Sequence, residues 1–444
     1  MLVPSVLQAQ ASPAAVPPAR DPRVRAIAHA PSAERIESDI QTLVGFGTRS
    51  TLSDTLSETR GIGAARRWIK AEFDRISAAC GGCLEVSFQR SLVEGDPESR
   101  IKDDTWVVNV VAIQRGATMP NRYVIMSGDI DSRVSDVTDA TSENPGANDN
   151  ASGMAGAIEA ARVLSQYRFD KTIVYAGLSG EEQGLFGGQH MADVAVNEGW
   201  IIEGVLNNDM IGNIHGLNGV IDNTTFRVFS EPTPVTETEV ERRRRRFTGG
   251  EVDGVSRQLA RYVDRITEMY FTNLDAMMIY RLDRFGRGGH HRPFNDRGFP
   301  GVRIMETNEN YTRQHQDLRT ENGIEYGDVI EWVDFDYAAK LTGVNAAVMA
   351  ALAWAPAAPQ NVEIAGAVRP STTLSWEPSP SSNVVGYKVY WRLTTAPQWT
   401  DWVWVGNVGE HTLENVVIDN YLFGVAAVAA NGDESAVVFP GGGR

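Results

Sequence analysis

The sequence has few cysteines, no long apolar run and no excess of basic residues. Its 444 residues include two cysteines, and no apolar run reaches the roughly 18 residues that a membrane-spanning helix needs. Asp and Glu number 57 against 41 Lys and Arg, which gives a net charge of -16. This charge argues against nucleic acid or an anionic membrane as a partner. The length predicts two or three domains and allows a buried catalytic sheet.

The two cysteines, Cys80 and Cys83, are separated by two glycines and follow a helical segment. No second pair completes a zinc knuckle, and a thioredoxin-like motif would lie between a strand and the start of a helix. The spacing therefore favours a small disulfide in an oxidising compartment, with two unpaired thiols as the alternative.

The first residues resemble the end of an export signal. Ala9, Gln10 and Ala11 have the small-x-small pattern of a cleavage site and precede a Pro/Ala-rich stretch, although no basic segment comes before them. We therefore predict an extracytoplasmic protein, secreted or periplasmic, from which a signal peptide is removed. A disordered tail is the alternative.

Residues 34–354 alternate helical and strand patterns. The stretch 61–76 has amphipathic helical spacing, whereas 105–113 and 172–178 are short apolar runs of strand length. This alternation predicts an α/β domain in which helices flank a mixed, largely parallel sheet. Acidic and basic blocks near 231–254 indicate a solvated, salt-bridged insertion in this domain.

Residues 361–440 differ in character from the α/β domain. Short alternating strands separated by Pro, Ser, Gly and Asn turns predict a small all-β sandwich. With Trp376 in an early strand and Tyr421 near the position of a tyrosine corner, the segment resembles a fibronectin type III domain. We expect it to contact other proteins or surface polymers, since it has no ionisable cluster. Residues 355–360 are then a linker, and 1–33 a signal remnant with a second linker.

Acidic residues follow several of the predicted strands. Asp129 and Asp131 come directly after the strand 122–128, and in an extended backbone they point to the same face. Two carboxylates this close repel each other unless a positive group lies beside them, and a metal ion is the obvious candidate. Parallel sheets bind ligands at the carboxyl ends of their strands, where further acids also lie: Asp149, Glu181, Glu182 and Asp209.

Each of these acids alone has a simpler explanation. Asp149 and Asp209 suit helix caps or turns, and Glu181 and Glu182 suit an acidic first helical turn. The glycine-flanked pair of glutamates nevertheless allows a division of roles, because one can bind a metal ion while the other takes a proton from water. The occurrence of acidic residues in four such segments within 81 residues favours a shared site.

Five motifs are similar, in this order, to those of the co-catalytic zinc aminopeptidases of clan MH, peptidase family twenty-eight: SGDIDS, PGANDNASG, SGEEQGLFG, NNDMIG and RQHQD. The resemblance covers residues 34–354 and implies the zinc-exopeptidase fold with two divalent metal ions, taken to be zinc. It implies that one residue, Asp149, bridges the two ions. The implied ligands are, for a first site, Asp129, Asp149 and Asp209 and, for a second site, Asp149, Glu182 and His315.

The resemblance also implies roles for residues beside the metal ions. Glu181 is the general acid/base, and Asp131 is the carboxylate that orients its neighbour. His291 matches an active-site histidine in a segment that the family writes Asp-His, where this chain has His290 and His291.

A further departure is Asp129, which stands where the family has a histidine ligand. Aspartate is a competent oxygen ligand for zinc, but it adds negative charge and favours harder ions such as manganese, magnesium or calcium. The first site is therefore expected to be empty or to hold a harder ion.

The resemblance implies a metallo-aminopeptidase, a hydrolase that cleaves the N-terminal bond of a peptide substrate with a metal-activated water and Glu181. Three alternatives stay open. The intact second site permits a single-zinc enzyme in the manner of the glutaminyl cyclases. Arg284 or Arg287 facing the pocket would favour a carboxypeptidase, because an arginine binds a substrate carboxylate. The substitution at Asp129 favours a weakened or inactive peptidase that acts as a binding protein.

Overall fold

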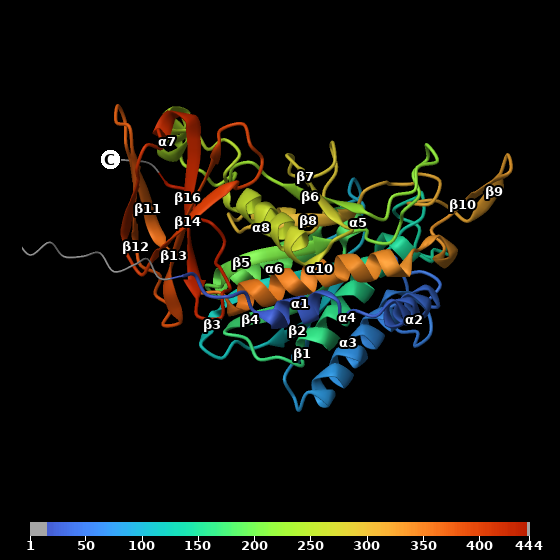
Figure 1. Ribbon diagram of the computed structural model, residues 1–444. Helices are drawn as coiled ribbons and strands as arrows, with labels where there is room; N and C mark the ends of the chain where they lie inside the picture. The colour runs from blue at the N-terminus through green and yellow to red at the C-terminus, as the bar shows by residue number, and fades with distance from the viewer. Residues whose placement is uncertain (1–15, 442–444) are drawn as a thin grey trace, which may run out of the picture. The chain divides into compact units, whose positions relative to one another are not determined.

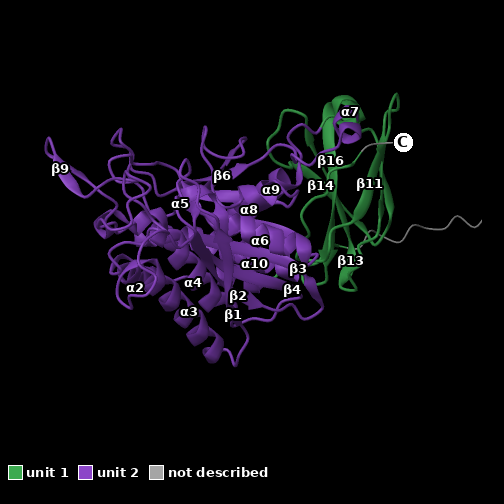
Figure 2. Cartoon of the chain, turned by 180° about the vertical axis from the view of Figure 1, so that it is seen from behind, with its two compact units in different colours: residues 1–21, 244–249, 355–444 green, residues 22–243, 250–354 purple. Residues whose placement is uncertain are grey.

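The computed structural model describes residues 16–441, which form two compact units (Figure 2). The α/β unit comprises residues 22–243 and 250–354. The β-sandwich unit comprises 244–249 and the described residues on either side of the α/β unit, up to 21 and from 355 onward. The division after residue 354 falls where the sequence predicts a linker to begin.

An eight-stranded mixed sheet forms the centre of the α/β unit, in the order β1-β2-β4-β3-β5-β8-β6-β7 (Figure 1). Its strands are β1 (Glu85–Val93), β2 (Thr105–Gln114), β3 (Met119–Asp129), β4 (Lys171–Leu178), β5 (Ile201–Asn208), β6 (Thr225–Ser230), β7 (Asp275–Ile279) and β8 (Gly301–Glu306). The central strands β4, β3, β5 and β8 pair in parallel, and so do β6 and β7, whereas the other pairs are antiparallel. The predicted fold class is confirmed. A two-stranded hairpin, β9 (Arg319–Glu321) and β10 (Ile324–Tyr326), lies outside this sheet.

Helices cover both faces of the sheet. They are α1 (Pro22–Ala28), α2 (Ala33–Val44), α3 (Gly61–Ala79), α4 (Gly153–Leu164), α5 (Glu181–Gly184), α6 (Phe186–Asn197), α8 (Val255–Tyr270), α9 (Arg292–Asn295) and α10 (Phe335–Trp354), with short turns η1 (Ala147–Ser152) and η2 (Ile330–Trp332). α3, α4, α10 and α8 contact one another in one layer, and α6 and α9 contact each other in a second. Neighbouring side chains of β3 face different layers. Met126 packs toward α4, and Ile125 packs with the α6 residue Met191.

Burial explains why the central strands read as continuous apolar runs. Every residue of β4 and of β8 is buried, as expected for parallel strands covered on both faces. The one basic residue inside β8 is Arg303, which is fully buried as well. A buried guanidinium needs acidic partners, and an acid at the carboxyl end of the neighbouring strand can be one of them.

The segment before residue 34, for which the sequence predicts a signal remnant and a linker, contains a helix among its described residues. Helix α1 lies in it and packs on α10 (Figure 1). Val24 and Ile27, three residues apart, are both fully buried, and the guanidinium of Arg23 lies 3.9 Å from the ring centroid of Trp354. The segment is helical because it can bury this apolar pair against a helix more than 300 residues away. The predicted cleavage site at Ala9 to Ala11 lies outside the described residues.

A disulfide joins Cys80 and Cys83 just after α3, as the sequence favoured. In the region of 231–254 the chain forms a helix, α7 (Glu239–Thr248), without a buried residue. Within residues 16–441 no helix is long and apolar enough to cross a membrane.

The β-sandwich unit has two three-stranded antiparallel sheets, β11-β12-β15 and β14-β13-β16. The strands are β11 (Gln360–Ala365), β12 (Thr372–Glu377), β13 (Val384–Leu393), β14 (Asp401–Gly406), β15 (Glu410–Leu413) and β16 (Tyr421–Ala429), with a turn η3 (Ile418–Asn420). Trp376, Tyr387 and Phe423 are buried in its core. An all-β sandwich is therefore present, while its likeness to fibronectin type III stays a prediction.

Candidate metal centre

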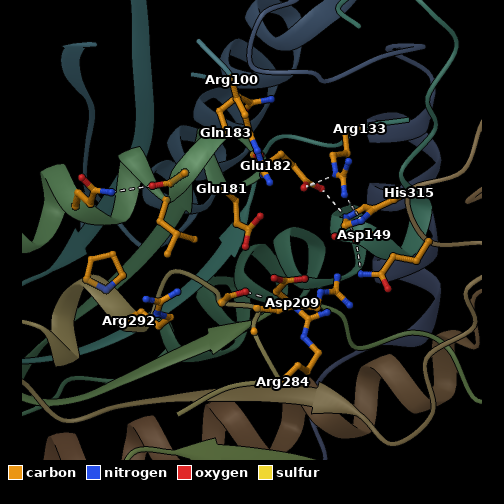
Figure 3. Close-up of a pocket in the computed structure, with 18 of the residues that line it drawn as sticks. Arg100, Arg133, Asp149, Glu181, Glu182, Gln183, Asp209, Arg284, Arg292 and His315 are labelled. Atoms are coloured by element: carbon orange, nitrogen blue, oxygen red, sulfur yellow. Dashed lines mark hydrogen bonds and ion pairs between the residues drawn. The ribbon is translucent and has the colours of Figure 1, made fainter. Parts of the chain in front are cut away.

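Three parallel strands end at one edge of the sheet and bring the predicted acids together. Asp129 ends β3, the pair Glu181 and Glu182 follows β4, and Asp209 follows β5 directly. A cavity of about 920 Å³ opens at this edge, and four of the predicted acids and His315 line it (Figure 3): Asp149, Glu181, Glu182 and Asp209. The carboxyl ends of these strands are where the sequence placed the site.

Asp149, Glu182 and His315 form the candidate metal site. Nε2 of His315 lies 2.9 Å from Oδ2 of Asp149 and 3.0 Å from Oε1 of Glu182. One ligand atom from each residue lies within 4.8 Å of the other two, and this is the one such group in the described part of the chain. Two carboxylates and one imidazole are a ligand set that zinc accepts. The second site expected from the motifs is therefore assembled.

The pKa shifts of His315 and Asp149 favour a positive charge between the three side chains. Burial acts to lower the pKa of His315, but the carboxylates of Glu182 and Asp149 outweigh it and raise that pKa to about 9. Burial acts to raise the pKa of Asp149, whereas His315 and Gln314 hold it well below its usual range. These opposite shifts have one cause, which is that the position between the three side chains favours a positive charge, and a divalent ion could supply that charge in place of a proton.

Arg133 contacts the same group from its other side. Its Nε lies 2.9 Å from Oε2 of Glu182, and its Nη2 lies 2.7 Å from Nδ1 of His315. When Nε2 of an imidazole binds a metal ion, the ring proton sits on Nδ1. Arg133, which can only donate, could then no longer make a hydrogen bond to Nδ1.

Two buried residues hold the loop that carries Asp149. The carboxylate of Asp328 accepts the backbone N–H groups of Asn148 and Asp149, the latter at 2.7 Å. Arg49, which is 1% exposed, donates to the carbonyl oxygens of Ile130, Pro145 and Gly146. Arg49 therefore ties the turn after β3 to the segment before Asp149.

The carboxylate of Glu181 points into the cavity without a hydrogen-bond or ion-pair partner among residues 16–441 (Figure 3). It begins α5 after Gly180, whose φ of 73° makes the sharp turn out of β4. Burial, Glu182 and Asp209 raise the pKa of Glu181 well above its ordinary value. A carboxyl group with a raised pKa and no fixed partner is suited to accept and return a proton.

Asp129 is close to the candidate metal site but is engaged elsewhere. Its Oδ1 lies 2.6 Å from Nδ1 of His290, and its Oδ2 accepts a hydrogen bond of 2.7 Å from Asn150. Burial lowers the pKa of His290 to about 4 and raises the pKa of Asp129 to about 7. An uncharged imidazole in this position can donate its Nδ1 proton to Asp129.

Asp209 lines the cavity and is held by Arg303. Nη2 of Arg303 lies 2.8 Å from Oδ2 of Asp209, and Nε of Arg303 donates to the carbonyl oxygen of Asp209 at 2.6 Å. Burial acts to lower the pKa of Arg303, but Asp209 and Asp283 outweigh it and raise that pKa above its ordinary value. The three ligands expected for the first site, Asp129, Asp149 and Asp209, are therefore not gathered as a metal-binding group.

Asp131 and His291 occupy buried positions behind the cavity wall. Oδ2 of Asp131 accepts the backbone N–H of Glu182 at 3.1 Å, so it supports a metal ligand other than the neighbour predicted for it. Burial, with Asp129 and Glu182, raises the pKa of Asp131 to about 6. Nε2 of His291 lies 2.8 Å from the carbonyl oxygen of Leu282. Neither residue lines the cavity.

The sequence analysis missed the basic residues that contact the site. Arg133 is only two residues beyond Asp131, directly after the motif SGDIDS, and contacts two of the ligands. Arg303 is the one basic residue in a strand that is apolar except for its last residue, Glu306, and this is a sequence signal for a buried ion pair. Asp328 had no such signal, because it lies in a polar loop among other acids.

Comparison with known proteins identifies the family. Residues 109–335, just over half of the chain, match peptidase family M28. A probable zinc metalloprotease of Leptosphaeria maculans is 45% identical over 426 residues, which are 96% of this chain and 98% of the relative. A probable zinc metalloprotease of Pyrenophora tritici-repentis is 44% identical over 428 residues, which are 96% of this chain and 88% of the relative.

Solved structures share the fold. LapA of Legionella pneumophila, an aminopeptidase, has a TM-score of 0.52 and 18% identity, over 79% of this chain and 76% of that one. A glutaminyl cyclase of Macrostomum lignano has a TM-score of 0.52 and 14% identity, over 76% of this chain and 94% of that one. With the family match and the fungal relatives that it spans almost end to end, this chain belongs to peptidase family M28.

Proposed function

We propose that the protein is a metal-dependent exopeptidase, and that it acts as an aminopeptidase. The observation that carries this proposal is the unpartnered carboxylate of Glu181 in the same cavity as Asp149, Glu182 and His315. Zinc held by those three residues would polarise the substrate carbonyl and make a water molecule more acidic. The names of the fungal relatives support zinc as the ion.

Residues of the chain then handle the protons and the substrate. A carboxylate oxygen of Glu181 accepts a proton from the attacking water and returns it to the leaving amine. Arg133 holds Glu182 in place through its ion pair. The cavity wall is rich in charged side chains of both signs, which suits the charged end of a peptide better than an internal segment.

Aminoacyl anilides and short peptides test this proposal directly. We expect zinc-dependent release of the N-terminal residue, its loss on chelation, and at least about tenfold slower cleavage of N-acetylated analogues, because the free amine is part of what the cavity recognises. Equal rates on substrates blocked at both ends would show an endopeptidase. Ammonia release from N-terminal glutamine would show a cyclase, and a zinc-loaded protein without turnover would be a binding protein.

A second candidate, a preference for a substrate carboxylate, is favoured by Arg292. Six arginines line the cavity: Arg100, Arg133, Arg284, Arg287, Arg292 and Arg297. Arg284 and Arg287 both contact Glu309, and Arg297 contacts Asp193. The Arg292 guanidinium lies over Gly288, where a Cβ would come within 2.7 Å of Nη1, and it has no ion-pair partner among the described residues. A guanidinium in this state is available to bind a carboxylate.

We expect Arg292→Gln to raise KM about tenfold or more for substrates with a carboxylate near the scissile bond, with little change in kcat, since one charge-assisted contact is lost. Steady-state kinetics on matched pairs would locate that carboxylate. Dipeptides against their C-terminal amides test an α-carboxylate, and glutamyl against leucyl anilides test an acidic side chain. Arg297→Gln is the control, because Arg297 lines the same cavity but is already paired. An equal effect of both variants, or none from Arg292→Gln, would exclude this role.

We also propose that the protein acts outside the cytoplasm. The disulfide between Cys80 and Cys83 supports this location, because such bonds persist in oxidising compartments. Contacts of the β-sandwich unit with other proteins or surface polymers are a further proposal.

A further inference from the structure

We propose that the protein holds a single metal ion, at Asp149, Glu182 and His315. Arg303 and His290 instead contact Asp209 and Asp129, the carboxylates that a second ion would need. This inference rests on the metal site of the proposed function, but it concerns the number of ions and not the reaction. It follows from the contacts of Asp129 and Asp209.

Both carboxylate oxygens of Asp129 already have hydrogen-bond partners. His290 and Asn150 engage its two carboxylate oxygens, at 2.6 and 2.7 Å. Asn150 is fixed in turn, because its Nδ2 also donates to the carbonyl oxygen of Asn208 and its Oδ1 accepts the backbone N–H of Gly153. All of this lies in the interior, where Asp129 is 2% exposed and His290 fully buried. A metal ion bound to Asp129 would have to compete with these buried hydrogen bonds, and a buried polar group that loses its partner destabilises the fold.

Asp129 and His290 are exchanged relative to the family pattern. The family pattern that this sequence resembles has histidine at position 129 and aspartate at position 290. This chain has the reverse, and the two side chains are in contact. Either change alone would bury two carboxylates or two imidazoles against each other. Two buried carboxylates repel, so the second change compensates the first. The result is a buried carboxylate–imidazole pair in which the metal-binding histidine of the pattern is absent from its usual place.

Charge around Asp209 is balanced by the protein. Arg303 contacts Asp209 at 2.8 Å and Asp283 at 3.2 Å, and Arg284 also contacts Asp283 at 3.2 Å. Two arginines thus face two aspartates, and Arg303 is fully buried. A further divalent ion next to the Arg303 guanidinium would be repelled by it, because both are positive and little water screens them.

His290 does not create a replacement site. Its Nε2 is buried and without a hydrogen-bond partner. Outside Asp149, Glu182 and His315, however, residues 16–441 contain no three ligand atoms of His, Cys, Asp or Glu within 4.8 Å of one another. The described residues therefore form one candidate cation site. At the other expected site, side chains of the protein pair with the carboxylates.

Metal counting tests the inference without reference to activity. The full chain is saturated with zinc, freed of loose metal by gel filtration, and analysed by plasma mass spectrometry alongside three variants. We expect one zinc per chain in the wild type and in Asp129→Asn, which keeps the size of the side chain. We expect more than tenfold weaker zinc binding, by titration calorimetry, in His315→Ala and Asp149→Asn.

Two zinc ions in the wild type would overturn the inference, and so would a drop in zinc content on Asp129→Asn. A crystal of the wild type measured at the zinc edge does not depend on any variant folding. One anomalous peak among Asp149, Glu182 and His315 is the expected result, whereas a second peak beside Asp209 or His290 would contradict it. A protein with one zinc and no peptidase activity would refute the proposed function and leave this inference standing.

Discussion

Replacing Glu181 with glutamine lowers kcat for peptide hydrolysis by about 100-fold to 10,000-fold, the usual share of general acid–base catalysis. Glutamine has the same shape as glutamate but cannot take a proton from water or return one to an amine. Because the carboxylate of Glu181 has no hydrogen-bond or ion-pair partner among residues 16–441, the substitution removes no side-chain hydrogen bond or ion pair there. Rates on an aminoacyl anilide, measured at saturating zinc, give the decrease.

Zinc content and thermal stability separate this role from a structural one. Glu181 is close enough to Glu182 and Asp209 for both to raise its pKa, so the neutral glutamine relieves repulsion and should not lower the melting temperature. Zinc content should stay as in the wild type. Glu268→Gln, on the exposed side of α8, is the matched control and should leave kcat unchanged. Loss of zinc in the Glu181 variant would make Glu181 a ligand, and an unchanged kcat would assign the proton transfer to another group.

The sequence could predict which acids gather at one edge of the sheet, because each of them lies at or just after the end of a strand. Glu181 and Glu182 follow an apolar strand and a glycine, and Asp209 follows another strand, so parallel pairing alone brings them to one edge. His315 is far along the chain and could be assigned only through its motif. Its φ of 56°, uncommon for a residue other than glycine, is likewise a property of the folded loop.

What could not be predicted depends on contacts between distant segments. His290 and Asp129 are 161 positions apart, and nothing local in either segment shows that they touch. In the sequence the two departures from the family pattern are separate substitutions. In the structure their side chains are in contact, so that one substitution compensates the other. Helix α1 is a similar case, because seven residues form a helix here only by packing on α10.

Arg303→Met is expected to lower the free energy of unfolding of the α/β unit by about 3 to 5 kcal/mol, the usual effect of removing one partner of a buried ion pair. Methionine fits the length of the side chain but leaves Asp209, which is 3% exposed, without its cation, and removes one of two arginines from Asp283. Scanning calorimetry of the metal-free protein measures the loss, and it can resolve the transitions of two units.

Two companion variants decide whether the uncompensated charge causes that loss. Arg297→Met removes an exposed pair with Asp193 and should cost no more than about 1 kcal/mol. Adding Asp209→Asn to Arg303→Met removes the orphaned charge and should restore part of the stability, so that the two changes are clearly non-additive. If Arg303→Met cost less than about 1 kcal/mol, or if the second change only added to the damage, Arg303 would not be the counter-charge of Asp209. The place beside that carboxylate would then again need a cation from outside the chain.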